Sequence, residues 1–433
     1  VHPEEEPPMT TDTARPRRRS IARGYRRATV GAAAAAALLV TAACGSGATP
    51  PTAASSTLKP IDQAALQTLV DTTMTERLIP GGVVLLRGPQ GEHIAAHGTT
   101  ELGGGTAPTA DTHVRIASIT KSMTAASILL LAQDGKLALT DPISKYVPEV
   151  PDGDGITIAQ LLEMRSGLYN YTDDPVLAAG IDADHQRVWK PQELLAIAFS
   201  HPPNFAPGAD YEYSNTNYAV LGLVAERVDG KPLATVLQDR VFGPLGMTDS
   251  FLPPPDSVVL PDPFSHGYMY GSSAHVFGDG FPYTPQEQAA AHAGTLLPID
   301  YTDVNHTFAF GTGGVVSTAN DLATFFTAYV GGGLLDPAYQ KLLINSLQLE
   351  HADKPGQYYG YGLSAIRWPD NSIEYHGGET AGFNLFAGYD RTNKTAIVVW
   401  TNLTLGVDDG GANANNMMLK VFDRFYNPSP LAP

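Results

Sequence analysis

The stretch Val114-Arg115-Ile116-Ala117-Ser118-Ile119-Thr120-Lys121 leads directly into an apolar segment that ends at Gln133. This segment predicts a helix over residues 120–133. Positions i and i+3 of a helix share one face, so the Ser118 hydroxyl and the Lys121 amine can meet. Ser118 would stand at the helix amino terminus, where the dipole favours negative charge. The pair fits an activated serine nucleophile, although an N-cap serine beside a solvated lysine has the same spacing.

A second candidate element is Tyr213-Ser214-Asn215. In an extended chain Tyr213 and Asn215 point the same way. A lysine ammonium about 4 Å away would lower the pKa of a tyrosine by about three units at an effective dielectric of about 20. Tyr213 could then act as a base near neutral pH, while Asn215 could bind a substrate amide. The alternative is a polar aromatic turn without a catalytic role.

The third candidate element is His376-Gly377-Gly378-Glu379, which precedes a predicted strand over residues 383–389. Two glycines beside a strand allow a ligand to approach the backbone closely. A plain hairpin turn would have the same composition, so this element gains meaning only together with the other two.

Strand patterns lie near both ends of the chain, and helical patterns fill the middle. The predicted strands are residues 82–87, 92–97, 371–376, 383–389 and 395–401. The predicted helices are residues 58–78, 120–133, 158–163, 192–199, 217–227, 233–240, 319–329 and 407–426. This order predicts one sheet domain closed by both chain ends, with a helical domain inserted between them.

We place the domain boundaries where these patterns change. The sheet domain would be discontinuous, over residues 58–117 and 305–427, and the mainly helical domain would cover residues 118–304. Residues 252–304 are rich in Pro, Gly and aromatic side chains. A long irregular stretch of this kind is either a wall of a functional site or a solvent loop.

The amino terminus has the pattern of an export signal. An arginine-rich region precedes the apolar run Val30–Ala43, which is too short to cross a bilayer and ends at Cys44. The run resembles a bacterial lipobox, so we expect a signal peptide over residues 1–43, lipidation of Cys44 and a flexible tether over residues 44–57. The protein would then be exported and anchored to the outer face of the cell membrane. The alternative is cleavage by an ordinary signal peptidase, followed by secretion.

Composition excludes several classes of protein. The formal net charge is −17, which argues against binding to nucleic acid. The chain has one cysteine, so it cannot form an internal disulfide or a site with several thiolate ligands. No run of 18 or more apolar residues is present, so a membrane contact would depend on the lipid alone.

Taken together, the three elements resemble the S-x-x-K, Y-x-N and H/K-x-G motifs of the serine β-lactamase and penicillin-binding protein superfamily. The resemblance covers about residues 60–426. Further matching stretches are residues 114–118, 161–168, 205–208, 243–247 and 313–318. The sequence is most similar to the secreted D-alanyl-D-alanine carboxypeptidases of Streptomyces type, whose third motif also begins with His.

The resemblance implies an α/β (α+β) fold of the β-lactamase/transpeptidase type. An antiparallel sheet flanked by helices would lie beside an all-helical domain, with the active site between them. Ser118 would be the acylated nucleophile, Lys121 and Tyr213 would share the proton transfers, and Asn215 would hold the substrate. No metal or organic cofactor is implied.

The same resemblance assigns roles to the third motif. His376 would support Tyr213 electrostatically, and the backbone of Gly377, Gly378 and Glu379 would border the substrate. The backbone N–H groups of Ser118 and Glu379 would form an oxyanion hole, in which each donor contributes about 3 kcal/mol.

The third motif departs from the carboxypeptidase pattern at two positions. Those enzymes bind a substrate carboxylate with hydroxyl groups and a basic residue, whereas this chain has Gly377 and Glu379. If the Glu379 side chain faced the site at about 5 Å, it would disfavour a carboxylate by about 3 kcal/mol. Arg367 is the nearest basic candidate for that carboxylate.

We therefore expect an exported serine hydrolase that acts on D-alanyl-D-alanine peptides of the cell wall, with β-lactams as acylating ligands. An esterase or D-aminopeptidase on the same fold needs no carboxylate anchor, and Gly377 and Glu379 favour it. The motifs are also compatible with a β-lactamase and with a non-catalytic penicillin-binding sensor. The substrate would be a small molecule or a peptide, and the sequence does not set the oligomeric state.

Overall fold

The structure is a computed structural model that describes residues 57–277, 283–353, 356–368 and 371–427. The predicted signal peptide, Cys44 and nearly all of the tether lie outside the described residues. These three assignments therefore stay predictions.

An eight-stranded antiparallel sheet forms the centre of the molecule, in the order β3-β2-β13-β12-β11-β10-β9-β8. The strands are β2 (Gly81–Gly88), β3 (Gly91–Gly98), β8 (Gln348–Leu349), β9 (Tyr358–Tyr359), β10 (Ser364–Trp368), β11 (Asn371–Thr380), β12 (Phe383–Asp390) and β13 (Thr395–Thr401). Strand β2 from the amino-terminal part pairs along its length with β13 from the carboxy-terminal part. This pairing confirms that the two chain ends close one sheet.

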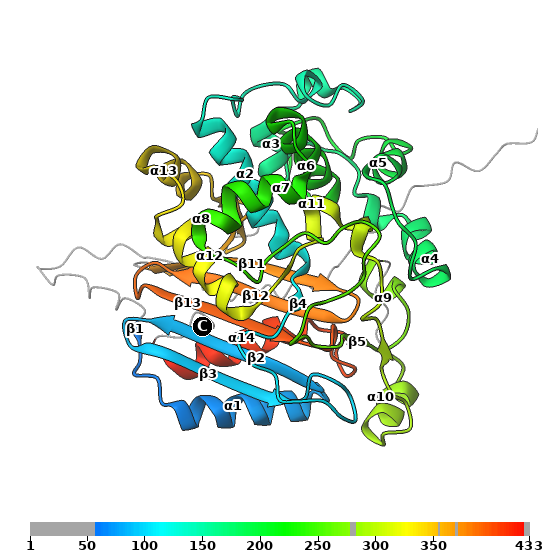
Figure 1. Ribbon diagram of the computed structural model, residues 1–433, viewed down its shortest axis with the longest axis vertical. Coiled ribbons are helices and arrows are strands. Elements are labelled where there is room, and N and C mark those ends of the chain that lie inside the picture. Colours follow the sequence, from blue (N-terminus) through cyan, green and yellow to red (C-terminus); the bar gives the residue numbers. More distant parts are fainter. Residues whose placement is uncertain (1–56, 278–282, 354–355, 369–370, 428–433) are drawn as a thin grey trace, which may run out of the picture.

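Helices cover both faces of the sheet (Figure 1). Helices α1 (Gln63–Glu76) and α14 (Asn413–Phe425) cover one face, and α12 (Ala319–Gly331) packs on the other. Because side chains alternate along a strand, Val399 of β13 packs in the core beneath α14, whereas Trp400 packs in the core on the opposite face. Because both faces of β13 are buried, its sequence is a nearly continuous run of apolar residues.

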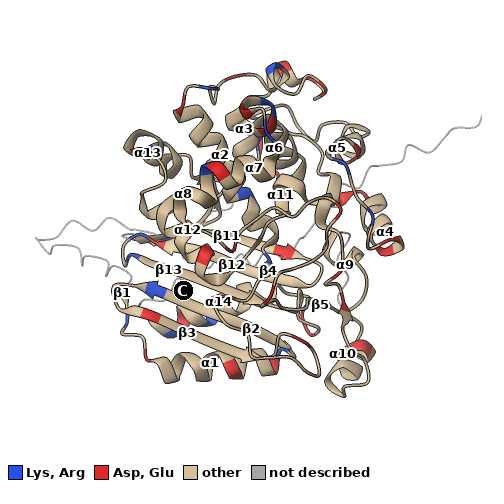
Figure 2. Ribbon diagram, viewed as in Figure 1, with Lys and Arg blue, Asp and Glu red and all other residues tan. Residues whose placement is uncertain are grey.

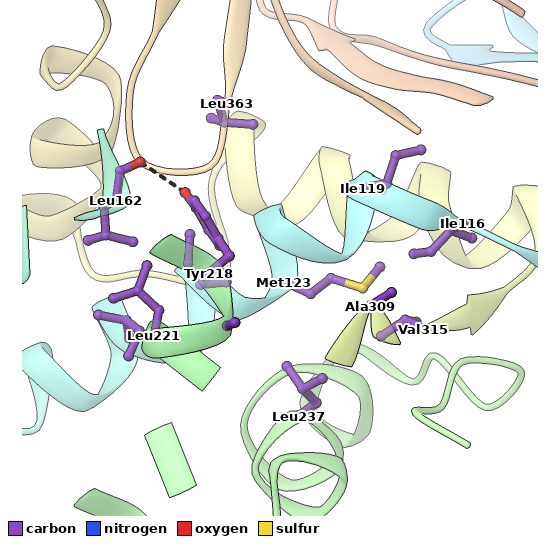
Figure 3. Close-up of a cluster of buried hydrophobic side chains, with 14 of the residues drawn as sticks. Ile116, Ile119, Met123, Leu162, Tyr218, Leu221, Leu237, Ala309, Val315 and Leu363 are labelled. Atoms are coloured by element: carbon purple, nitrogen blue, oxygen red, sulfur yellow. Dashed lines mark hydrogen bonds between the residues drawn. The ribbon is translucent and has the colours of Figure 1, made fainter. Parts of the chain in front are cut away.

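The helical domain lies beside the α12 face of the sheet (Figure 1). Its helices are α2 (Thr120–Gln133), α3 (Ile158–Leu162), α4 (Pro175–Ala183), α5 (Pro191–Phe199), α6 (Asn215–Asp229), α7 (Leu233–Leu237), α8 (Gly243–Leu245) and α11 (Phe310–Gly313), with α13 (Pro337–Asn345) at its edge. Helix α2 is buried along nearly its whole length. Met123 of α2 packs with Leu237, Ala309 and Val315 in one cluster (Figure 3).

Residues 252–304 contain short elements joined by irregular chain. These elements are β5 (Tyr268–Met269), α9 (Ala274–Phe277), α10 (Pro285–His292) and β6 (Ile299–Asp300). The Tyr268 N–H is shared between Asn402 O (2.8 Å) and Gly382 O (3.1 Å) at the end of the sheet. Part of the segment predicted to belong to the helical domain is therefore bonded to the sheet instead.

Small two-stranded pieces lie outside the eight-stranded sheet. Strand β1 (Thr57–Leu58) pairs with β14 (Tyr426–Asn427), and β4 (Val114–Arg115) pairs with β7 (Val316–Ser317). Charged residues gather on helices and loops, while the central strands β12 and β13 are almost free of them (Figure 2). Within the described ranges, no helix has both the length and the apolar character needed to cross a bilayer.

Candidate active site

Ser118 lies in a tight turn between β4 and α2. The residue before it, Ala117, has a φ of +48°, in the left-handed region that L residues avoid. Backbone pairing holds this conformation, because the Ile116 N–H donates to Val315 O at 3.1 Å. Strain of this kind persists where the surroundings enforce it, and here it sets the direction of Ser118.

Lys121 lies one turn further along and is fully buried. Its Nζ is 3.0 Å from Ser118 Oγ and donates to Thr312 O of α11 at 2.8 Å. The contact between Ser118 and Lys121 that the spacing predicts is thus confirmed. Sequence reasoning missed Thr312, whose carbonyl directs the amine, and the only signal for it was its place directly before the Gly313-Gly314 stretch.

Tyr213 and Asn215 reach the same place from the start of α6. The Lys121 ammonium lies 4.9 Å from the centre of the Tyr213 ring. The Asn215 side chain donates from Nδ2 to Thr172 Oγ1 at 3.0 Å, and its backbone N–H donates to Asn170 Oδ1 at 2.9 Å. The structure therefore brings the first two predicted motifs together around one serine.

A pocket opens at Ser118, and Asn215 and Glu379 belong to its wall. Its lining residues are Ala117, Ser118, Tyr171, Thr172, Asn215, Phe277, Phe308, Ala309, Thr312, Gly313, Glu379 and Thr380. Among these described lining residues, Glu379 is the single charged one. Phe277 shows that the irregular segment 252–304 contributes to a wall of the site.

The third motif lies on β11, next to the turn that holds Ser118. Strand β10 pairs only with residues 371–375, so the half of β11 from His376 to Thr380 pairs with β12 alone in the described sheet. A Cβ at Gly378 would lie within 3.0 Å of Ile116 O. Glycine at this position therefore lets the strand touch the backbone of the nucleophile's turn.

His376 is buried and uncharged. Burial, together with the charge of Lys121, lowers the pKa of its imidazole to about 3. Its Nδ1 lies 2.6 Å from Gly377 O, and its Nε2 lies 3.1 Å from the hydroxyl of Tyr359. His376 stands beside Tyr213, with 6.3 Å between the ring centres. The predicted support of Tyr213 would thus come from a neutral ring, with Lys121 as the source of positive charge.

Glu379 points away from the turn that Gly378 touches. Side chains alternate along a strand, so Gly377 and Glu379 face the side of the sheet opposite to Gly378. There the Glu379 carboxylate accepts a hydrogen bond from Asn384 Nδ2 at 3.3 Å. The residue still contributes to the pocket wall, with its charge beside the site and not directly facing Ser118.

The prediction that Arg367 binds a substrate carboxylate is wrong on geometric grounds. Arg367 pairs with Ser372, six residues along β11 from Gly378, which corresponds to about 20 Å. Its guanidinium stacks on the Tyr358 ring at 4.1 Å. The sequence alone does not give the register between β10 and β11, and that register decides the distance.

The chain was compared with known families and proteins. The family described as Beta-lactamase matches residues 66–421. The putative penicillin-binding protein PbpX of Bacillus subtilis (strain 168) is 25% identical over 300 residues, which are 69% of this chain and 64% of that protein. Esterase EstB of Burkholderia gladioli is 34% identical over 202 residues, which are 43% of this chain and 50% of the esterase. The chain thus spans between half and two thirds of these relatives.

A solved structure overlaps with most of the chain. The D-stereospecific amidohydrolase from Streptomyces sp. superposes with a TM-score of 0.69 and 27% identity, and the match covers 83% of this chain and 98% of that one. An overlap of this extent includes most of the described residues of both the sheet and the helical domain.

Proposed function

The chain belongs to the Beta-lactamase family, whose members are serine hydrolases, and from this we propose that it cleaves amides and esters of D-amino acids through an acyl-enzyme on Ser118. A neutral or amine-bearing substrate is expected, not one that must be anchored by a carboxylate. Membership of the family supports the type of reaction, and the charged side chains around the pocket support the class of substrate.

The acylation step uses the groups gathered at the pocket. Ser118 Oγ forms a bond to the substrate carbonyl carbon while its proton passes to Tyr213, whose phenolate is stabilised by the Lys121 ammonium. The N–H groups of Ser118 and Glu379 stabilise the oxyanion. Tyr213 then returns the proton to the departing amine or alcohol, and water releases the acyl group by the reverse sequence.

One observation carries the choice of substrate class. The described lining of the pocket contains Glu379 and no basic side chain, and Arg367 lies about 20 Å along the strand. Lys121 is buried and already bonded to Ser118 and Thr312. A substrate carboxylate would therefore find one carboxylate beside the site and no basic side chain in the described wall, whereas an amide, an ester or an amine needs no cation there.

The relatives' names support the same class. One curated relative is an esterase, and one solved relative is a D-stereospecific amidohydrolase. These names describe those proteins, and their substrates become candidates for this chain because its pocket offers no anchor for a carboxylate.

D-Alanyl-D-alanine carboxypeptidase activity is the second candidate. The His376-Gly377-Gly378 motif, which resembles that of the Streptomyces-type carboxypeptidases, and the penicillin-binding relative favour it. This candidate requires a cation for the terminal carboxylate, and the described pocket wall supplies none.

A matched substrate pair separates the two candidates. The kcat/KM of an acyl-D-alanyl-D-alanine peptide would be compared with that of the same peptide carrying a carboxy-terminal amide, alongside D-alanine amide and a nitrophenyl ester. We expect the peptide with the carboxy-terminal amide to be cleaved at least about ten-fold faster than the peptide with the free carboxylate, since about 1.4 kcal/mol corresponds to a factor of ten. Faster cleavage of the free carboxylate would favour the carboxypeptidase instead.

We also propose that the protein is exported and anchored through Cys44. The support is the apolar run Val30–Ala43 and the position of the cysteine directly after it. Radiolabelled fatty acid should enter the wild-type protein and not Cys44→Ala, and the variant should appear in the medium. Equal labelling of both proteins would contradict the assignment.

A further inference from the structure

Tyr359 of β9 lies directly against the third motif, although it lies outside the three motifs that the sequence indicates. Its side chain is buried, with 2% of the residue exposed, and its hydroxyl lies 3.1 Å from His376 Nε2. The two rings meet edge to face, with their centres 5.8 Å apart. The contact joins a short strand near the sheet edge to the strand that borders Ser118.

The direction of this hydrogen bond follows from the other partner of the imidazole. Gly377 O can only accept, so the His376 Nδ1 that lies 2.6 Å from it carries the proton. The low pKa of the ring, about 3, means that Nε2 is then unprotonated and accepts. Burial raises the pKa of the Tyr359 hydroxyl well above its usual value, so this hydroxyl keeps its proton and donates.

His376 lies on β11 just beyond the point where β10 ends. Strand β10 does not extend past the residue opposite Tyr375, so the part of β11 that follows lacks a described strand on this side. The imidazole binds Gly377 O there, two residues before the Glu379 N–H that is proposed as an oxyanion donor. The hydrogen bond between Tyr359 and His376 thus lies next to the part of β11 that β10 does not reach.

The base proposed for acylation packs against the same pair. The Tyr213 ring lies edge to face with Tyr359, at 6.1 Å between centres, and 6.3 Å from His376. The titratable groups around the imidazole are thus Lys121 from α2, Tyr213 before α6 and Tyr359 from β9. A change in the protonation of His376 would alter the electrostatic surroundings of Tyr213 and the hydrogen bond to Gly377 O on β11.

We propose that Tyr359 is a positioning residue. Its hydroxyl donates to His376 Nε2 and thereby stabilises the tautomer in which Nδ1 donates to the carbonyl of Gly377 on strand β11. The inference rests on the proposed acylation at Ser118. Tyr359 also packs edge to face against the Tyr213 ring, and its hydroxyl has Tyr218 as a second neighbour, so the proposed role is that of the hydroxyl hydrogen bond to His376 Nε2.

The first test is Tyr359→Phe, with Tyr361→Phe as the matched control. Tyr361 lies on the same segment and is 6% exposed, and removal of its hydroxyl leaves the His376 contact intact. We expect Tyr359→Phe to slow acylation by a fluorophosphonate about ten-fold, which is the effect of one hydrogen bond. Equal losses in both variants would indicate general packing and overturn the proposal.

The pH profile gives a readout that packing alone would not move. Loss of the donor removes a stabilising contact of the neutral imidazole, so the pKa of His376 rises from about 3. The acylation rate of Tyr359→Phe should therefore fall at a higher pH on the acid side than that of the wild type. An unchanged acid limb would contradict the proposal.

A double-mutant cycle tests whether Tyr359 acts through His376. In His376→Asn the amide N–H can replace the Nδ1 donor, but the shorter side chain places no acceptor at the position of Nε2, where the tyrosine donates. We expect Tyr359→Phe to have less than a two-fold further effect in that background. A full ten-fold loss there would show that Tyr359 acts elsewhere.

Nitrogen NMR of the histidine rings tests the tautomer of His376 without depending on any catalytic activity. The His376 resonance, identified by its absence in His376→Asn, should show protonated Nδ1 in the wild type and an altered pattern in Tyr359→Phe. If no probe acylates Ser118, the proposed function fails while this measurement still decides the tautomer. A wild-type ring protonated at Nε2 would overturn the inference.

Discussion

The carbonyl oxygen of Ile116 occupies the space that a Cβ on Gly378 would need. Strand β11 and the turn that carries Ser118 are therefore in backbone contact, although the two segments are more than 250 residues apart in the chain. Ser118 and Glu379, which lie shortly after the two contact positions in the chain, both line one pocket.

Gly378→Ala should lower acylation by at least about 100-fold, because strand β11 must move away from the Ser118 turn and one oxyanion donor moves with it. Unfolding should become easier by about 1–3 kcal/mol, as in other overpacked sites. Labelling rates and urea unfolding would measure the two effects.

Gly377→Ala is the matched control for this variant. A Cβ at Gly377 would meet nothing nearer than Asn415 Oδ1 at 3.8 Å, which is an ordinary contact. We expect acylation within about three-fold of the wild type and a free energy of unfolding within about 1 kcal/mol. A loss as large as that of Gly378→Ala would show that the contact with Ile116 is not the reason for the glycine.

Lys121→Met should reduce acylation about 10²–10⁴-fold, which is the usual contribution of a proton-transfer group. The substitution keeps the length of the side chain in a fully buried position, so unfolding should change by no more than about 2 kcal/mol. Stopped-flow labelling and thermal unfolding would give the two numbers. The exposed Lys341→Met serves as the control, and a Lys121→Met enzyme that acylates as fast as this control would remove Lys121 from the mechanism.

Glu163 should make stability depend on pH. Burial raises the pKa of its carboxyl to about 7, from an ordinary value of 4.5, while Arg165 partly opposes the shift. The folded state therefore binds a proton more tightly than the unfolded state, and stability is lost as the pH rises from about 4.5 to about 7. Glu163→Gln keeps the neutral form at every pH.

The difference between Glu163→Gln and the wild type should be near zero below pH 4.5 and grow to at most about 3 kcal/mol above pH 7. Denaturant unfolding at a series of pH values measures this difference. Glu76→Gln, at an exposed position, is the control substitution. Parallel curves for Glu163→Gln and the wild type would mean that Glu163 is solvated and ionises normally.

The parts of the fold that depend on local periodicity could be predicted from the sequence. The hairpin of β2 and β3 and the helix α2 lie where the pattern places them, because alternation and helical period are local properties. The first helix is shorter than predicted, since Asp62 caps it by accepting from the Ala65 N–H and the chain before it contains Pro60. Helix α13 and strand β10 lack a clear pattern, and the sequence predictions missed both.

The site was predictable where motifs are close in sequence and unpredictable where it depends on packing. The Ser118–Lys121 contact follows from one turn of helix, whereas the bonds of Lys121 to Thr312 and of His376 to Tyr359 join separate elements. Strand register, which the sequence leaves open, is the reason that Arg367 was misplaced. Contacts between elements that are far apart in the chain leave no pattern in the local sequence from which they could be predicted.

The most direct test is the intact mass of the protein after incubation with a fluorophosphonate or a penicillin. We expect one covalent adduct on the wild-type chain, located on the peptide that contains Ser118, and none on Ser118→Ala. An adduct that persists in Ser118→Ala, or that maps to another residue, would contradict the assignment of Ser118 as the nucleophile.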